Sequence, residues 1–261
     1  MSLHRRAIRS LAWVFLSLVA WAALAAGVAR ANELDHVFEE GNRAYAEGRF
    51  ADALASYQRL LDHGVRDPAV LMNAGNACYR LERFAEARLA WERALRRAPG
   101  DRDLGENLGL AVKALGLEAL PAPSWPERTF VAVLGVASAD GWGLLALAAW
   151  LGLNAALGWC WVSDRGRRPA IAVAVLAAAV AIGAAPVAWA FRARIVRPEA
   201  VVLGDAAAAL SGPTPGATAL FTVPVGEKVG VEGASGEWTH VSLPNGWHGW
   251  VPSVSLGRVD R

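Results

Sequence analysis

The chain has 261 residues, of which 54% are hydrophobic and 19% are charged. This is more apolar and less charged than an average soluble domain, so membrane segments are expected. The net charge of +2 excludes the strong positive field that nucleic-acid binders carry. Two cysteines are too few for a disulfide-stapled or zinc-clustered scaffold, and the many apolar residues exclude a wholly disordered chain.

Residues 1–31 have the three parts of a secretory signal peptide. A basic start is followed by an uncharged stretch from Leu11 to Ala29 and by the small-residue end Ala29-Arg30-Ala31. Cleavage after Ala31 is one outcome. Retention as an uncleaved anchor is the other, because the apolar stretch is longer than usual. Both outcomes place the following domain outside the cytoplasm.

Residues 32–120 contain an internal repeat. Residues of the same kind recur at an offset of 34 in the pairs Gly41/Gly75, Asn42/Asn76, Tyr45/Tyr79, Phe50/Phe84, Ala53/Ala87, Tyr57/Trp91 and Leu61/Leu95. This is the period of the tetratricopeptide repeat, which the segment resembles closely. The resemblance implies two pairs of antiparallel helices that touch at the glycine and alanine positions. Residues 103–115 repeat the first-helix pattern only, so we expect a capping helix there.

Asparagines on the expected first helices are the candidate partner-binding residues. The resemblance implies that these helices form a concave face that binds peptides. The candidate residues on that face are Asn42, Asn73, Asn76 and Asn107, with Arg80 nearby. The alternative is that the asparagines only hydrogen-bond the backbone within the array.

Some tetratricopeptide relatives clamp a C-terminal carboxylate on this face with asparagines and basic residues. Asn42 and Asn73 match the asparagines of that clamp. Phe38, Glu106 and Leu110 stand where its basic residues are expected, which argues against carboxylate capture at this face.

No catalytic motif stands out, and an enzyme is not expected. The sequence has no nucleophile elbow, zinc-protease motif, phosphate-binding glycine loop or C-x-x-C pair, and its histidines are scattered. Carboxylates and arginines at helical spacing, such as Glu92/Arg96, are expected on solvated helix faces. Cys78 is expected to be a buried, inert thiol. No metal site or cofactor is predicted.

Two uncharged runs of 21 residues predict a transmembrane hairpin. The expected parts are a linker and interfacial segment (121–141), a first span (142–162), a cytoplasmic loop (163–169) and a second span (170–191). Three arginines in the loop favour its retention in the cytoplasm, which leaves both flanking domains on the outer side. A buried core helix is the alternative for either run alone. Asn154, inside the first span, is expected to hydrogen-bond the other helix.

Residues 192–261 predict a small β-barrel. Its expected strands are Ala200–Leu203, Ala219–Val223, Lys228–Glu232, Trp238–Leu243 and Gly249–Pro252. The runs Val225–Val229, Gly236–Val241 and Gly246–Val251 resemble the bacterial SH3-like domain. Trp238 and Trp250 are expected in the core. Trp247 and His248 are candidates for a binding surface, the alternative being a turn aromatic and a surface histidine.

The chain is therefore expected to be mainly α, with a tetratricopeptide-repeat array, a transmembrane hairpin and an SH3-like barrel. This order resembles the BatE-type proteins of the Bat aerotolerance operons. The resemblance implies an inner-membrane protein with both soluble domains in the periplasm. It also implies von Willebrand factor A-domain membrane proteins as partners and, through them, a MoxR-type AAA+ ATPase. The expected role is a non-enzymatic adaptor or scaffold in oxidative or envelope stress tolerance. The alternative is an envelope tether that binds peptidoglycan through the SH3-like domain.

Overall fold

The structure is a computed structural model. The structure describes residues 33–118, 125–137, 139–162, 167–195 and 198–260. The expected signal peptide, residues 1–31, lies outside these residues. The chain divides into two compact units, Met1–Arg66 and Asp67–Arg261, and each is treated by itself below.

The described part of the first unit is one antiparallel helix pair. Residues 33–46 form the first helix and α2 (Phe50–Asp62) the second. The helices touch where Gly41 lies under Tyr57, since a Cβ at Gly41 would come within 2.7 Å of Tyr57 Cε1. Tyr57 and Ala53 are fully buried. The expected role of the small residues is thus confirmed in this pair.

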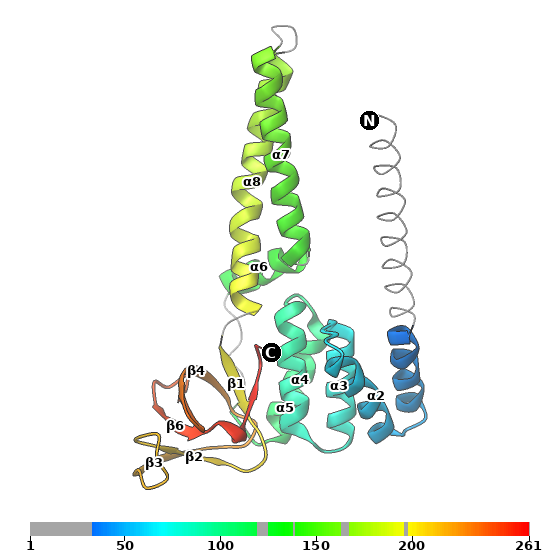
Figure 1. Ribbon diagram of the computed structural model, residues 1–261. Helices are drawn as coiled ribbons and strands as arrows, with labels where there is room; N and C mark the ends of the chain where they lie inside the picture. The colour runs from blue at the N-terminus through cyan, green and yellow to red at the C-terminus, as the bar shows by residue number, and fades with distance from the viewer. Residues whose placement is uncertain (1–32, 119–124, 138, 163–166, 196–197, 261) are drawn as a thin grey trace, which may run out of the picture. The chain divides into compact units, whose positions relative to one another are not determined.

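The second unit begins with three helices, α3 (Pro68–Arg80), α4 (Phe84–Arg97) and α5 (Arg102–Ala114) (Figure 1). Asp67 and Asp101 cap α3 and α5, because their carboxylates accept hydrogen bonds from backbone N–H groups of the first turn. A Cβ at Gly75 would come within 2.4 Å of Trp91 Nε1, so α3 and α4 repeat the contact of the first pair. The expected second helix pair and the following helix are both present.

A short helix and a long hairpin follow. They are α6 (Trp125–Gly135), α7 (Ala139–Val162) and α8 (Arg167–Ile195). Leu134 of α6 is buried against Trp142 and Val187 of the hairpin. Gly152 and Ala177 approach closely, since a Cβ at Gly152 would lie 4.0 Å from the Ala177 Cβ. As expected from sequence, small residues let α7 and α8 pack against each other.

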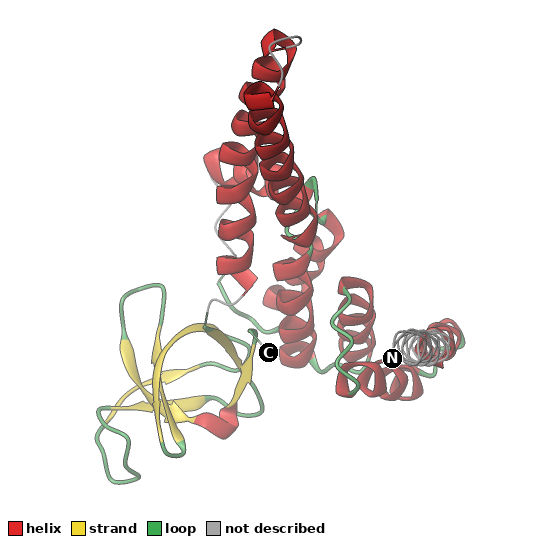
Figure 2. Ribbon diagram, turned by 45° about the horizontal axis from the view of Figure 1, so that its top comes forward, coloured by secondary structure: helices red, strands yellow, loops and turns green. Residues whose placement is uncertain are grey.

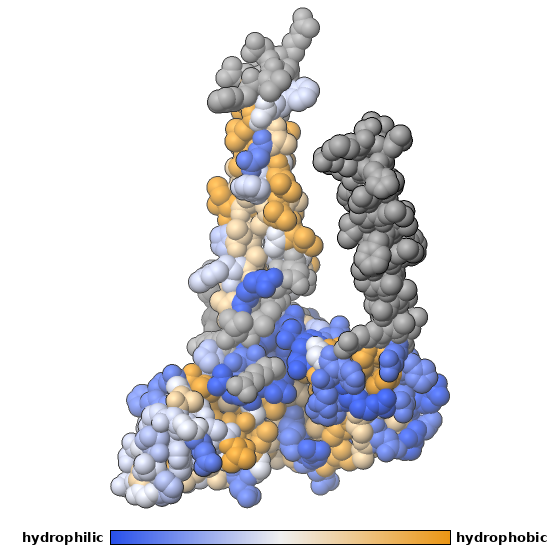
Figure 3. All heavy atoms as spheres, in the orientation of Figure 1, coloured by the Kyte–Doolittle hydropathy of each residue, from blue (hydrophilic) through white to orange (hydrophobic). Residues whose placement is uncertain are grey.

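Both hairpin helices are long and apolar enough to cross a membrane, over Gly141–Cys160 and Ala170–Ala190. Their outer surface exposes large apolar side chains, including Trp150, Ile182 and Trp189. In Figure 3 the visible face of the hairpin is largely hydrophobic. The expectation that Asn154 hydrogen-bonds the other helix is wrong. Its amide donates instead to the Trp150 carbonyl of its own helix, at 2.7 Å.

The C-terminal part is a seven-stranded antiparallel sheet in the order β3-β2-β6-β5-β4-β1-β7. Its strands are drawn in yellow in Figure 2. The strands are β1 (Glu199–Val202), β2 (Ala207–Leu210), β3 (Ala219–Val223), β4 (Lys228–Ser235), β5 (Trp238–Ser242), β6 (His248–Pro252) and β7 (Leu256–Arg258), with a 3-10 turn at Ser253–Ser255. The strands β2 and β7 were not predicted from the sequence. The first is an alanine run with little intrinsic β preference, and the second is only three residues long.

The core of the C-terminal sheet is made of alanines and valines, which leaves the tryptophans outside it. Thr239, Val241 and Val251 point inward, and alternation along β5 and β6 then places Trp238 and Trp250 on the other face. Both tryptophans are half-buried. The expectation that they form the core is therefore wrong.

Candidate functional site

Asn42 contacts its own repeat through its side-chain oxygen. The Tyr57 hydroxyl donates to Asn42 Oδ1 at 2.9 Å, across the first helix pair. Asn42 thus holds the aromatic ring that fills the space above Gly41. The side chain stays half-buried.

Asn76 makes the equivalent contact in the second unit. The indole Nε1 of Trp91 donates to Asn76 Oδ1 at 3.2 Å, and the Asn107 amide donates to the same oxygen at 3.3 Å. The structure therefore brings Asn76 and Asn107 together. Asn73 lies one turn earlier on α3 and is half-buried, while Arg80, at the end of α3, is exposed.

These contacts bear on the two interpretations of the asparagines. The side-chain oxygens of Asn42 and Asn76 accept hydrogen bonds within the array, but from the Tyr57 hydroxyl and the Trp91 indole rather than from the backbone that the alternative named. An amide group also carries two N–H donors, so an oxygen that accepts inside the array does not by itself use up the hydrogen-bonding capacity of the side chain. We use the name asparagine face for the predicted binding residues, which are Asn42 in the first unit and Asn73, Asn76, Asn107 and Arg80 in the second. Their role in binding stays a prediction.

A surface that the sequence analysis missed joins α4 to the C-terminal sheet; we call it the α4–sheet interface. Arg96 Nη2 lies 2.6 Å from Glu199 Oε2, and Lys228 Nζ lies 3.2 Å from Glu92 Oε2. Glu92 and Arg96 are each only 5% exposed. The expectation that they lie on a solvated helix face is wrong, because each pairs with a residue of the sheet.

Apolar packing completes the α4–sheet interface. Leu89 of α4 is buried in a cluster with Val201 and Val259. A Cβ at Gly257 would come within 2.4 Å of Leu89 Cδ2, so the glycine admits this side chain. Arg93 also reaches the sheet, where its Nη2 donates to the Arg258 carbonyl at 2.6 Å.

Arg88 is the most enclosed cation of α4, with 3% of its surface exposed. Its Nη1 donates to the Gly226 carbonyl at 2.6 Å, whereas its Nε has no hydrogen-bond partner. The side chain lines a cavity of about 540 Å³ between the end of α5 and turns of the sheet. A volume of this size is typical of ligand pockets, which span roughly 300–1,000 Å³.

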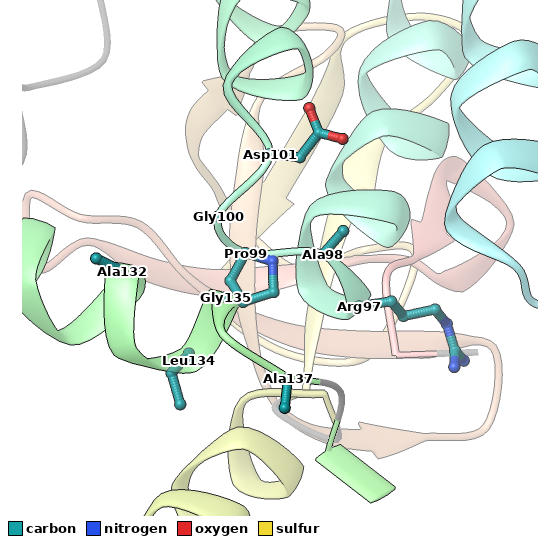
Figure 4. A pocket seen from close by; sticks show the side chains of 9 residues that line it. All are labelled: Arg97, Ala98, Pro99, Gly100, Asp101, Ala132, Leu134, Gly135 and Ala137. Carbon is teal, nitrogen blue, oxygen red and sulfur yellow. The ribbon is translucent and has the colours of Figure 1, made fainter. Parts of the chain in front are cut away.

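A second cavity, of about 340 Å³, lies between the α4–α5 turn and α6 (Figure 4). Its polar residues are Arg97 and Asp101. Asp101 already caps α5, where its carboxylate accepts from the Leu104 N–H at 3.1 Å. Because its carboxylate is used in this cap, Asp101 gives no reason to assign a ligand to this cavity.

Trp247 and His248, the two candidates on the C-terminal module, are both exposed, Trp247 to 56%. The Trp247 ring packs on Phe221, with centroids 5.1 Å apart. His240 lies beside Trp250 and places its Nδ1 3.0 Å from Glu232 Oε2. Trp247 and His248 are the exposed members of this group, which we call the exposed aromatic surface, whereas Phe221, His240 and Trp250 are half-buried.

Cys78 is buried in the second helix pair, as expected. Burial raises the pKa of its thiol to about 11, against a smaller opposing effect of the Arg83 charge. A thiol with this pKa is a poor nucleophile at neutral pH. Within the residues that the structure describes, no three His, Cys, Asp or Glu side chains are grouped to hold a metal ion.

Comparison with known proteins defines the class of the helical array. Residues 38–102 match the family described as Tetratricopeptide repeat. This segment covers both helix pairs, so the array is a tetratricopeptide repeat region, and such regions bind proteins. No curated protein matches the chain.

Proposed function

We propose that this protein is a non-enzymatic, membrane-anchored adaptor that binds protein partners through its tetratricopeptide repeats. The observation that carries the proposal is the match of residues 38–102 to a protein-binding repeat, followed in the same chain by an apolar helix hairpin. The hairpin holds the repeats at a membrane, where α7 and α8 bury their exposed leucines and tryptophans in lipid.

The topology proposed is a hairpin with both soluble parts on the outer side of the inner membrane. The α4–sheet interface supports it, because α4 precedes the hairpin, the sheet follows it, and the two can pair only on one side. The expected signal peptide supports the periplasmic side. Protease added to intact spheroplasts should therefore digest both soluble parts, and protection of either one contradicts this topology.

The finer identity proposed is that of a BatE-type protein with a C-terminal SH3-like domain. It rests on the order of the modules and on the glycine and tryptophan runs of the C-terminal sheet. The corresponding partners are von Willebrand factor A-domain membrane proteins and, indirectly, a MoxR-type AAA+ ATPase. The corresponding role is scaffolding in oxidative or envelope stress tolerance. Co-purification of such proteins with the full chain from detergent extracts tests this identity.

The asparagine face is tested by variants that separate binding from folding. Replacement of Asn42 and Asn76 by Asp keeps the oxygen that accepts from Tyr57 and Trp91 but removes the amide donors. We expect Asn42→Asp with Asn76→Asp to capture at least tenfold less partner, with unchanged helicity. Asn42→Ala with Asn76→Ala should lose partner capture as well, and two ring hydrogen bonds besides. Unchanged capture by both double variants would refute the assignment.

The exposed aromatic surface of the C-terminal sheet favours one second candidate, an envelope tether that binds peptidoglycan. Trp247 and Phe221 offer ring faces, and His248 adds a polar edge. Sedimentation of the full chain with isolated cell wall distinguishes the candidates. Co-sedimentation that is lost in Trp247→Ala, without any protein partner, supports the tether and contradicts the adaptor.

A further inference from the structure

Arg88 carries a buried charge that makes no ion pair with any described residue. Its guanidinium makes one hydrogen bond, to the neutral carbonyl of Gly226, and no described carboxylate lies within ion-pair distance. The Nε donor is buried without a partner. A buried, unpaired guanidinium is costly, because it has lost water without gaining a counter-charge.

The neighbouring charges of α4 are satisfied differently. Arg96 reaches the Glu199 carboxylate, and Glu92 reaches the Lys228 ammonium. These charges are explained by the α4–sheet interface alone. Arg88 therefore differs from its neighbours: it has no carboxylate partner among the described residues, and a cavity lies beside it.

The cavity beside Arg88 has the composition of a small peptide site. Apolar walls come from both sides, and the residues that form them are Leu115, Leu117, Pro224, Leu243 and Pro244. Glu118 and Asn245 are exposed at its rim, so the cavity is open to solvent. The carboxylates of Glu118 and Glu227 also line it and have no ion pair within the described residues, which favours a basic side chain in the same ligand.

We propose that this cavity binds a peptide carboxylate, with the Arg88 guanidinium as its partner. Guanidinium binds carboxylate in two parallel hydrogen bonds, so a bound carboxylate supplies the missing counter-charge. The carboxylate comes either from a chain terminus or from an acidic side chain. The site is separate from the asparagine face and does not depend on it.

The test uses the purified full chain in detergent and three pools of N-acetylated random hexapeptides, each peptide containing one Lys. The first pool has free C-termini and no acidic residue. The second is amidated and contains one Glu, and the third is amidated with Gln in place of Glu. We expect at least tenfold enrichment of the first or the second pool over the third, and which of them is enriched identifies the source of the carboxylate.

Variants assign the enrichment to Arg88. Arg88→Met should abolish it and shift the midpoint of thermal unfolding by less than about 5 °C, because removal of an unpaired charge costs little. The matched control is Arg83→Met, which removes an exposed arginine of the same helix region and should keep the enrichment. Asn42→Asp with Asn76→Asp should also keep it, which separates this site from the asparagine face.

Leu117→Glu provides a second variant that does not touch Arg88. It places a carboxylate on the cavity wall, so it should occupy the site from within the chain and abolish enrichment while the protein stays folded. Equal recovery of all three pools would overturn the proposal. So would enrichment that survives in Arg88→Met or in Leu117→Glu, or a large loss of thermal stability in Arg88→Met, since that would assign Arg88 a structural role.

Discussion

The two tetratricopeptide repeats share their inner contacts and differ on the outer face of the second helix. Inside, each repeat packs an aromatic ring over a glycine and holds that ring with an asparagine oxygen. The ring centroids of Tyr45 and Phe50 are 5.2 Å apart, and those of the equivalent residues Tyr79 and Phe84 are also 5.2 Å apart. The inner half of the repeat is therefore one packing unit used twice.

The outer faces show what the second repeat has gained. Gln58 and Asp62 of α2 are exposed, whereas their equivalents on α4, Glu92 and Arg96, are buried against the C-terminal sheet. Leu54 of the first repeat is replaced by Arg88. Differences between copies of a repeat thus indicate where one copy has acquired a new partner, here within the same chain.

The largest expected effect comes from breaking the α4–sheet interface. Glu199→Ala removes the carboxylate that pairs with the buried Arg96, and we expect a loss of about 3 kcal/mol in the free energy of unfolding. The matched control is Glu40→Ala, which removes the exposed pair with Arg59 at 3.5 Å and should cost less than about 1 kcal/mol. Chemical denaturation of the full chain in detergent measures both. Equal losses would show that the Arg96–Glu199 pair adds no more stability than an exposed ion pair.

The inner contact is tested by adding a methyl group under the ring. Gly75→Ala should lower stability by about 2 kcal/mol, because the new Cβ would overlap the Trp91 indole. Gly109→Ala is the control, since nothing lies within 4 Å of a Cβ there, and it should be neutral or stabilising. A Gly75→Ala variant as stable as the Gly109→Ala variant would mean that close approach of α3 and α4 is not required.

The turns between the paired helices offer a smaller comparison. Gly48 and Glu82 are equivalent, and both have a left-handed φ, of 77° and 60°. Glu82→Gly should raise stability by about 1 kcal/mol, since only glycine adopts this conformation without cost. Gly48→Ala should lower it by a similar amount. Opposite signs in thermal unfolding are the expected result, and a destabilised Glu82→Gly would contradict the explanation.

Cys78 gives a test of burial without a large energetic effect. Because its pKa is raised to about 11 from 9.0, its thiolate fraction at pH 8 should be about 100-fold below that of an ordinary thiol. In a Cys160→Ser background, alkylation by iodoacetamide should be slow at pH 8, should accelerate as the pH rises toward 11, and should become fast in denaturant. Rapid labelling of the folded protein at pH 8 would show that the second helix pair opens readily.

Much of the architecture was predictable because its sequence signals either recur at a fixed period or extend over many consecutive residues. The 34-residue self-similarity identified the glycine–aromatic contacts, and the uncharged runs identified α7 and α8. The sheet was predicted less well. Alanine-rich β2 has no local preference for a strand and pairs with β3 and β6 only in the folded protein. Trp238 and Trp250 were misplaced because the inner face was already filled by valines and alanines.

The sequence by itself determined the order of the modules, the repeat and the apolar hairpin, because each of these is written in local periodicity or composition. Only the tertiary structure decided which charges are buried. Arg96 pairs with Glu199, which lies 103 residues further along the chain. A local periodic pattern cannot predict a partner at that sequence separation. The burial of Arg88 is a second example. The residues that enclose it follow α5 or lie in turns of the sheet, so its burial could not be predicted from the sequence around Arg88.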